Sequence, residues 1–143
     1  MIIARNWTIK ISSQIHQLVY RTSRGRLVGR LGRAQFLLLT TTGRKSGRPH
    51  TVPLLYLMNN GDYAFVGSYG GNPRDPDWVL NIKRDARVSI NIRATSLAGT
   101  ARIATDPERQ RLWPEFVAVF PNYDHYQSRT ARRIPIILVE APA

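Results

Sequence analysis

The sequence predicts a mainly β (α+β) protein, in which a small antiparallel barrel is surrounded by helices. The first observation is a series of short apolar or alternating segments, separated by Gly, Pro and Asn turn residues, as is typical of strands. These segments are residues 36–42, 51–57, 63–68, 87–92, 95–104 and 134–139. The second observation is that helical patterns are few, and occur in the N-terminal segment, at residues 75–84 and at residues 105–119.

The first two predicted strands flank a basic turn. Phe36–Thr42 is apolar and then β-branched, and Thr51–Leu57 resumes a strand after the glycines and proline of the turn. Four basic or titratable side chains lie between them: Arg44, Lys45, Arg48 and His50. Arginine matches two oxygens of a phosphate or carboxylate, and a Gly-containing turn can offer N–H groups to an anion. The turn therefore predicts either an anion site or an ordinary solvated hairpin. A strand, not a helix, follows it, so it is not a Walker-type nucleotide loop.

The later elements rest on local signals. Asn59–Asp62 is a strong turn signal, and the adjacent glycines Gly70–Gly71 let the backbone approach a ligand closely. The helix predicted at 75–84 has acidic residues in its first turn and basic residues in its last, which complements the helix dipole. The helix at 105–119 begins with a Thr N-cap followed by Asp, Pro and Glu.

Composition restricts the function classes. The 143 residues fit one globular core, and the 21 basic against 9 acidic residues give a net charge of +12, which implies an acidic partner. No helix-turn-helix, zinc-finger or RNA-recognition signature accompanies this charge, so nucleic acid is not the expected partner. There is no Cys, and His16, His50 and His125 are far apart, so neither a disulfide framework nor a metal site is predicted.

We divide the chain into residues 1–32, a basic amphipathic helix with its linker, and residues 33–143, the barrel domain. Trp7 and three aliphatic residues recur at helical spacing in the first part. Such a helix either lies in a membrane interface or packs on the protein's own sheet. No run of about 18 apolar residues and no secretory signal is visible, so we expect a cytoplasmic protein, or one held at the inner face of the cell membrane.

Three motifs in the same order resemble the deazaflavin (coenzyme F420)-dependent nitroreductase and quinone reductase family. They are Thr41–Gly47, Gly67–Gly71 with the helix around Trp78, and Tyr123–Ser128 before the last strand, and together they cover nearly the whole chain from Arg33. The resemblance implies a split β-barrel that binds reduced F420 and transfers a hydride to a quinone, enone or nitroaromatic acceptor. The coenzyme carries a phosphodiester and an acidic polyglutamate tail, which agrees with a basic groove.

The resemblance also implies the site residues. Those that would bind the coenzyme are Arg44, Lys45, Ser46, Gly47, Arg48, His50, Pro53, Gly67, Ser68, Tyr69, Gly70, Gly71, Trp78 and Asn81. Those that would contact the acceptor and act in catalysis are Ser68, Tyr123 and Tyr126.

The chain departs from the family pattern at His50 and Tyr69, where basic phosphate contacts are expected, and at Leu55 and Phe120, where pocket tyrosines are expected. Two alternatives follow: a protein that binds deazaflavin without catalysis, and a basic module that binds nucleic acid or membrane. Trp78 is either a stacking surface for the coenzyme or part of the core.

Overall fold

The computed structural model of the chain describes residues 34–140. The helix predicted within residues 1–32 lies outside the described residues. Within 34–140, no helix is both long enough and apolar enough to cross a membrane.

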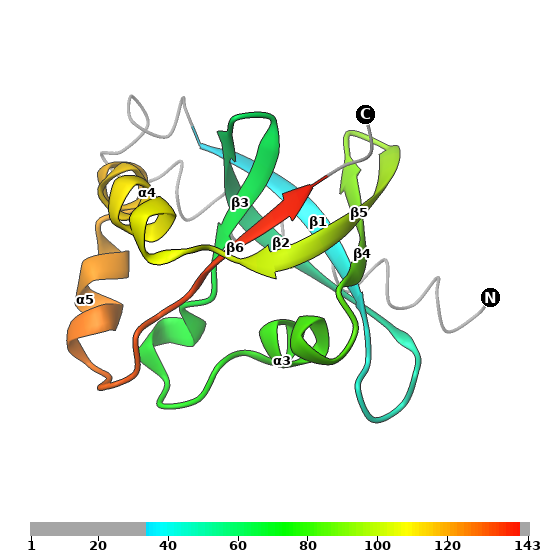
Figure 1. Cartoon of the computed structure of the whole chain (residues 1–143), viewed down its shortest axis with the longest axis horizontal. Coiled ribbons are helices and arrows are strands. Elements are labelled where there is room, and N and C mark those ends of the chain that lie inside the picture. Colours follow the sequence, from blue (N-terminus) through cyan, green and yellow to red (C-terminus); the bar gives the residue numbers. More distant parts are fainter. Residues whose placement is uncertain (1–33, 141–143) are drawn as a thin grey trace.

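Six antiparallel strands form a closed barrel in the order β1-β2-β3-β6-β5-β4, with β4 returning to β1 (Figure 1). Their bounds are β1 Gln35–Thr42, β2 Pro49–Asn59, β3 Asp62–Val66, β4 Arg87–Ile92, β5 Thr95–Ile103 and β6 Ile136–Glu140. The first hairpin is in register from the pair Gln35 and Tyr56 to the pair Thr42 and Pro49. The predicted mainly β fold is therefore confirmed. Closure of the barrel pairs each of these strands on both sides and leaves no free sheet edge.

The helices lie outside the strands and at one end of the barrel (Figure 1). A short 3-10 helix, η1 (Tyr69–Gly71), and α3 (Asp77–Arg84) lie between β3 and β4. Between β5 and β6 the chain forms α4 (Asp106–Val119) and α5 (Asn122–Ser128). The N-cap Thr105 accepts a hydrogen bond from the Glu108 amide, and the Glu108 side chain accepts one from the Thr105 amide, which is why α4 begins where the sequence predicts.

Two hydrophobic cores arise from strand alternation. The barrel interior contains Phe65 and Ile137 and is closed at one end by α3, whose Trp78 and Val79 are buried in it. The second core lies between the outer face of β2, β3 and β6 and the helices α4 and α5. Residues 136–139 of β6 are fully buried because alternate side chains enter the two cores.

Several boundaries differ from the predictions, and β2 extends two residues beyond its predicted range at each end. Strand β3 ends at Val66, and the following residues form a loop and η1. Helix α3 begins at Asp77, after Pro76. Strand β6 begins at Ile136, because the preceding Pro135 has no backbone N–H to donate to a neighbouring strand. Helix α5 was not predicted, because it has only seven residues, of which two tyrosines are apolar enough to pack; contacts with α4 and η1 stabilise it.

Candidate active site

An open cavity of about 510 Å³ lies where β2, the loop after β3, the start of α3 and the helix α5 meet. Its walls are mostly apolar and aromatic. They are formed by Phe36, Val52, Pro53, Leu54, Leu55, Val66, Ser68, Tyr69, Gly70, Pro76, Asp77, Trp78, Phe120, Tyr123 and Tyr126. A concave, largely apolar site with a few polar groups is typical of a binding site for a flat organic ligand.

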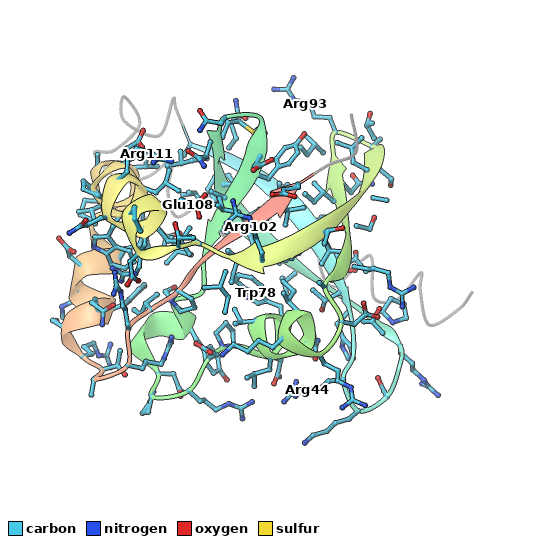
Figure 2. The ribbon with its side chains drawn as sticks, viewed as in Figure 1. Arg44, Trp78, Arg93, Arg102, Glu108 and Arg111 are labelled. Carbon is cyan, nitrogen blue, oxygen red and sulfur yellow. The ribbon has the colours of Figure 1, made fainter. Side chains whose placement is uncertain are left out.

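Trp78 belongs to both the core and the cavity. It is the second residue of α3, is only 7% exposed, and packs edge to face against Phe65 with 6.3 Å between ring centroids. Figure 2 shows it between α3 and the barrel strands. Because the barrel core holds most of the ring, the part that lines the cavity is a rigid surface. The two alternatives of the sequence analysis are therefore compatible.

Four hydroxyl groups belong to residues that line the cavity, those of Ser68, Tyr69, Tyr123 and Tyr126, and three of them are the predicted catalytic residues Ser68, Tyr123 and Tyr126. Tyr123 is 7% exposed and is surrounded by aromatic rings, of which Phe120 is the nearest at 5.0 Å between centroids. Burial raises the pKa of its phenol well above the usual 10, so Tyr123 keeps its proton and can donate it in a hydrogen bond. Ser68 and Tyr126 are half-buried.

Most of the backbone amides of the basic hairpin turn already donate hydrogen bonds within the protein, so few of them are available to an anion. The Gly43 amide donates to the Arg48 carbonyl at 2.7 Å, and the Gly47 amide donates to the Gly43 carbonyl at 2.8 Å. The Arg48 amide donates to Ser46 Oγ at 3.1 Å, and the Arg44 amide is also used by a side chain, described next. An anion at this turn would therefore be held mainly by side chains.

Helix α3 fixes the turn through Asn81, which is 3% exposed. Asn81 Oδ1 accepts from the Arg44 amide at 3.1 Å and from Arg44 Nη1 at 3.0 Å, and Asn81 Nδ2 donates to Thr41 Oγ1 at 3.1 Å. Arg44 Nη2 also pairs with Asp77 at 3.2 Å. The predicted coenzyme contact Asn81 thus lies behind the surface and supports Arg44.

A second, basic cavity of about 670 Å³ lies between this turn and the end of α3. Its lining contains four basic residues, Arg44, Lys45, Arg84 and Arg87, and one acidic residue, Asp85. Asp85 is already paired with Arg87 at 2.9 Å. Arg84 and Arg87 were missed by the sequence analysis, because they follow the turn by about 40 residues and only the fold brings them beside it.

The two cavities adjoin through one ion pair. Asp77 lines the apolar cavity, Arg44 lines the basic cavity, and their side chains are in contact. In Figure 2, Arg44 lies on the far side of α3 from Trp78. The arrangement fits an elongated ligand with a flat ring at one end and acidic groups at the other.

The predicted site residues separate into groups. The apolar cavity is lined by Pro53, Ser68, Tyr69, Gly70, Trp78, Tyr123 and Tyr126, and the basic cavity by Arg44, Lys45, Ser46 and Gly47. Arg48 and His50 are exposed on the turn, where His50 Nε2 lies 3.4 Å from Ser46 Oγ. Gly67, Gly71 and Asn81 are buried and support the surfaces that the others form.

The fold defines a class: the split-barrel proteins, to which a six-stranded antiparallel barrel with peripheral helices belongs. The family model described as F420H(2)-dependent quinone reductase matches residues 12–141, and the chain belongs to this family.

Individual relatives of the chain agree with this family assignment. An F420H(2)-dependent quinone reductase of Mycobacterium tuberculosis is 38% identical over 130 residues, which cover 88% of this chain and 87% of the relative. The solved structure of an F420-H2 dependent reductase (FDR-A) has a TM-score of 0.66 and 42% identity, over 73% of this chain and 93% of that one. A solved structure described as a domain-swapped dimer has a TM-score of 0.67 and 36% identity, over 93% and 98% of the two chains.

The family assignment confirms the predicted oxidoreductase. The protein is an F420H(2)-dependent enzyme that reduces quinone-type acceptors, with reduced F420 as its cofactor.

Proposed function

We propose that the apolar cavity is where the deazaflavin ring and the quinone meet, and that the basic cavity holds the acidic end of the coenzyme. The observation that carries this proposal is the contact between the two cavities through Arg44 and Asp77. Exposed Lys45 and the partly exposed Arg44 would bind the phosphodiester, with Arg84 and Arg87 beside them for further carboxylates. Trp78 and Pro53 would form the wall against the ring.

The bound coenzyme supplies two electrons as hydride, and the protein has to orient the acceptor and stabilise the charge that develops on its oxygen. The hydroxyl groups of Ser68 and Tyr126 are suited to hydrogen-bond that oxygen, because both residues line the same cavity. Tyr126 can also supply the proton that completes the hydroquinone. Tyr123 retains its proton because burial raises its pKa, so it serves as a hydrogen-bond donor.

Titration of the full chain with oxidised and reduced F420, followed by Trp fluorescence, tests the coenzyme site. Lys45→Ala is expected to weaken binding about tenfold, because one charge-assisted contact is lost. Arg93→Ala is a matched control, because Arg93 is exposed at the opposite end of the barrel from Arg44 (Figure 2). Equal affinity of Lys45→Ala and wild type would refute the basic cavity as the binding site.

The acceptor side is tested separately. The Tyr126→Phe enzyme is expected to bind F420 with the affinity of the wild type but to reduce quinone more slowly. Lys45→Ala, in contrast, is expected to lower the affinity for F420. Enones and nitroaromatic compounds can be compared in the same assay to define the acceptor range. A Tyr126→Phe enzyme with unchanged turnover would remove Tyr126 from the proposed chemistry.

We further propose that residues 1–32 hold the enzyme at an anionic membrane surface, where lipid quinones reside. The support is in the sequence: residues 1–32 contain six Arg or Lys and no Asp or Glu, and Trp7 and three aliphatic residues recur there at the spacing that predicts a helix. Co-sedimentation of the full chain with vesicles of anionic or zwitterionic lipid tests this. Lys10→Glu with Arg21→Glu should abolish anionic binding, and unchanged binding would refute the proposal.

A further inference from the structure

The loop that carries Ser68 has an unfavourable backbone. Tyr69, Gly70 and Gly71 are three successive residues with positive φ, at 47°, 62° and 80°. Tyr rarely adopts this conformation, and it persists only when surrounding contacts hold it. Within the loop, the Gly71 amide donates to the Ser68 carbonyl at 2.9 Å and the Asn72 amide to the Tyr69 carbonyl at 3.0 Å. Additional contacts must therefore fix the loop.

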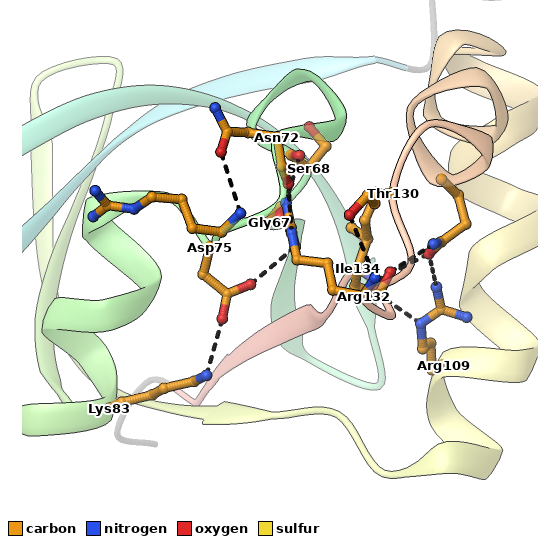
Figure 3. Close-up of polar contacts among 11 residues, drawn as sticks. Gly67, Ser68, Asn72, Asp75, Lys83, Arg109, Thr130, Arg132 and Ile134 are labelled. Atoms are coloured by element: carbon orange, nitrogen blue, oxygen red, sulfur yellow. Dashed lines mark hydrogen bonds and ion pairs between the residues drawn. The ribbon is translucent and has the colours of Figure 1, made fainter.

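Arg132 supplies these contacts from the segment before β6 (Figure 3). Its Nη1 donates to the Gly67 carbonyl at 3.2 Å, Nη2 to the Ser68 carbonyl at 2.8 Å, and Nε to the Asn72 carbonyl at 2.8 Å. One guanidinium thus binds both ends of the loop. Nη1 also pairs with Asp75 at 2.9 Å, and both side chains are only 15% exposed.

Arginine is specifically suited to this position. Its planar group directs several donors at fixed angles, whereas the lysine ammonium is a single point on a flexible stem. Asp75 neutralises the charge and is itself held by Lys83 at 2.9 Å (Figure 3). A lysine at position 132 would keep the charge but could not contact three carbonyl groups on two sides of the loop.

The same segment also holds α5. Gln127 Nε2 donates to the Arg132 carbonyl at 2.8 Å, and Gln127 Oε1 accepts from the Ile134 amide at 2.9 Å and from Arg109 Nη2 at 3.0 Å. Helix α5 and the loop are in direct contact, since a Cβ on Gly71 would lie 2.6 Å from the Tyr126 carbonyl oxygen. The backbone and side chain of Arg132 therefore connect two parts of the cavity wall, helix α5 and the loop that carries Ser68.

We propose that Arg132 is a positioning residue for the reaction. It does not line the cavity, but it fixes the loop with Ser68 relative to the helix with Tyr126, and so sets the space in which coenzyme and quinone are aligned. This inference rests on the proposed function of the apolar cavity. Small displacements matter there, because hydride transfer depends steeply on the geometry of the two reactants.

The test compares Arg132→Lys with Arg133→Lys in the full chain. Arg133 is 54% exposed and pairs with Asp106 at 3.1 Å, so it is a neighbour of equal charge without the loop contacts. For Arg132→Lys we expect amide hydrogen exchange in residues 68–72 to rise about tenfold in the absence of coenzyme. We also expect kcat for quinone reduction to fall about tenfold to a hundredfold. Arg133→Lys should stay within about twofold of wild type on both measurements.

The two readouts distinguish the possible failures. Unchanged exchange and unchanged kcat in Arg132→Lys would overturn the inference. A lower melting temperature with unchanged kcat below the transition would show a merely structural role, and would also overturn it. If the wild type binds no F420 or Lys45→Ala binds it normally, the proposed function fails, whereas the exchange measurement still tests the loop contacts. If Arg132→Lys does not fold, Asp75→Asn keeps the guanidinium but removes its counter-charge, and should change both readouts in the same direction by a smaller factor.

Discussion

Asn81→Ala separates two possible roles of this residue. If Asn81 only contacted the coenzyme, its replacement would weaken binding and leave stability unchanged. In the structure its side chain makes three hydrogen bonds, two with Arg44 and one with Thr41, whose side chain is 1% exposed. Its loss should therefore release the hairpin turn from α3 and lower both stability and coenzyme affinity.

The magnitude follows from the individual contacts. Each lost bond contributes about 1 kcal/mol net, and a buried Thr41 hydroxyl without a partner costs about 1–3 kcal/mol. Arg44 is 25% exposed and can bond to water instead, so its share is smaller. We expect the free energy of unfolding to fall by about 3 kcal/mol, which for a domain of this size lowers the melting temperature by about 10 °C.

Urea unfolding followed by circular dichroism, with F420 titration in parallel, measures both effects. Asn91→Ala is the matched control, because Asn91 makes one exposed bond, to Ser96 Oγ at 3.3 Å, and should cost about 0.5 kcal/mol. A loss below about 0.5 kcal/mol for Asn81→Ala would refute the reasoning. Weaker binding at unchanged stability would instead favour direct contact with the coenzyme.

Two further predictions concern the loop and the start of α4. Gly71→Ala should reduce stability and quinone turnover more than Gly70→Ala. Both residues have positive φ, but only at Gly71 would the new Cβ meet backbone, 2.6 Å from the Tyr126 carbonyl oxygen. Equal effects of the two substitutions on melting temperature and kcat would contradict this. Hydrogen bonds from Arg102 and from the N-cap amide lower the pKa of Glu108 from 4.5 to about 2. The contribution of Glu108 to the free energy of unfolding is therefore complete above about pH 4.5 and is lost as the pH falls toward 2. Glu108→Gln should lower the free energy of unfolding by about 1 kcal/mol at pH 7, with the difference from wild type shrinking below pH 4.5, and a pH-independent difference would argue against this origin.

The sequence by itself determined most of the elements and indicated an acidic ligand. Strand alternation, the Asn59–Asp62 turn and the Thr105 capping box are signals within a few residues, because backbone geometry and local hydrogen bonds act over that distance. The net charge of +12 likewise indicated an acidic partner. These signals, with the order of three motifs, were sufficient to predict the barrel and the oxidoreductase family.

Only the tertiary structure decided how the site is assembled. Arg132 contacts carbonyl groups 60 to 65 residues earlier in the chain, and Asn81 bonds to Arg44 and Thr41 about 40 residues before it. No local pattern records such contacts, because they depend on barrel closure bringing distant segments together. For the same reason the seven-residue helix α5 could not be predicted, because its packing against η1 and α4 depends on the fold.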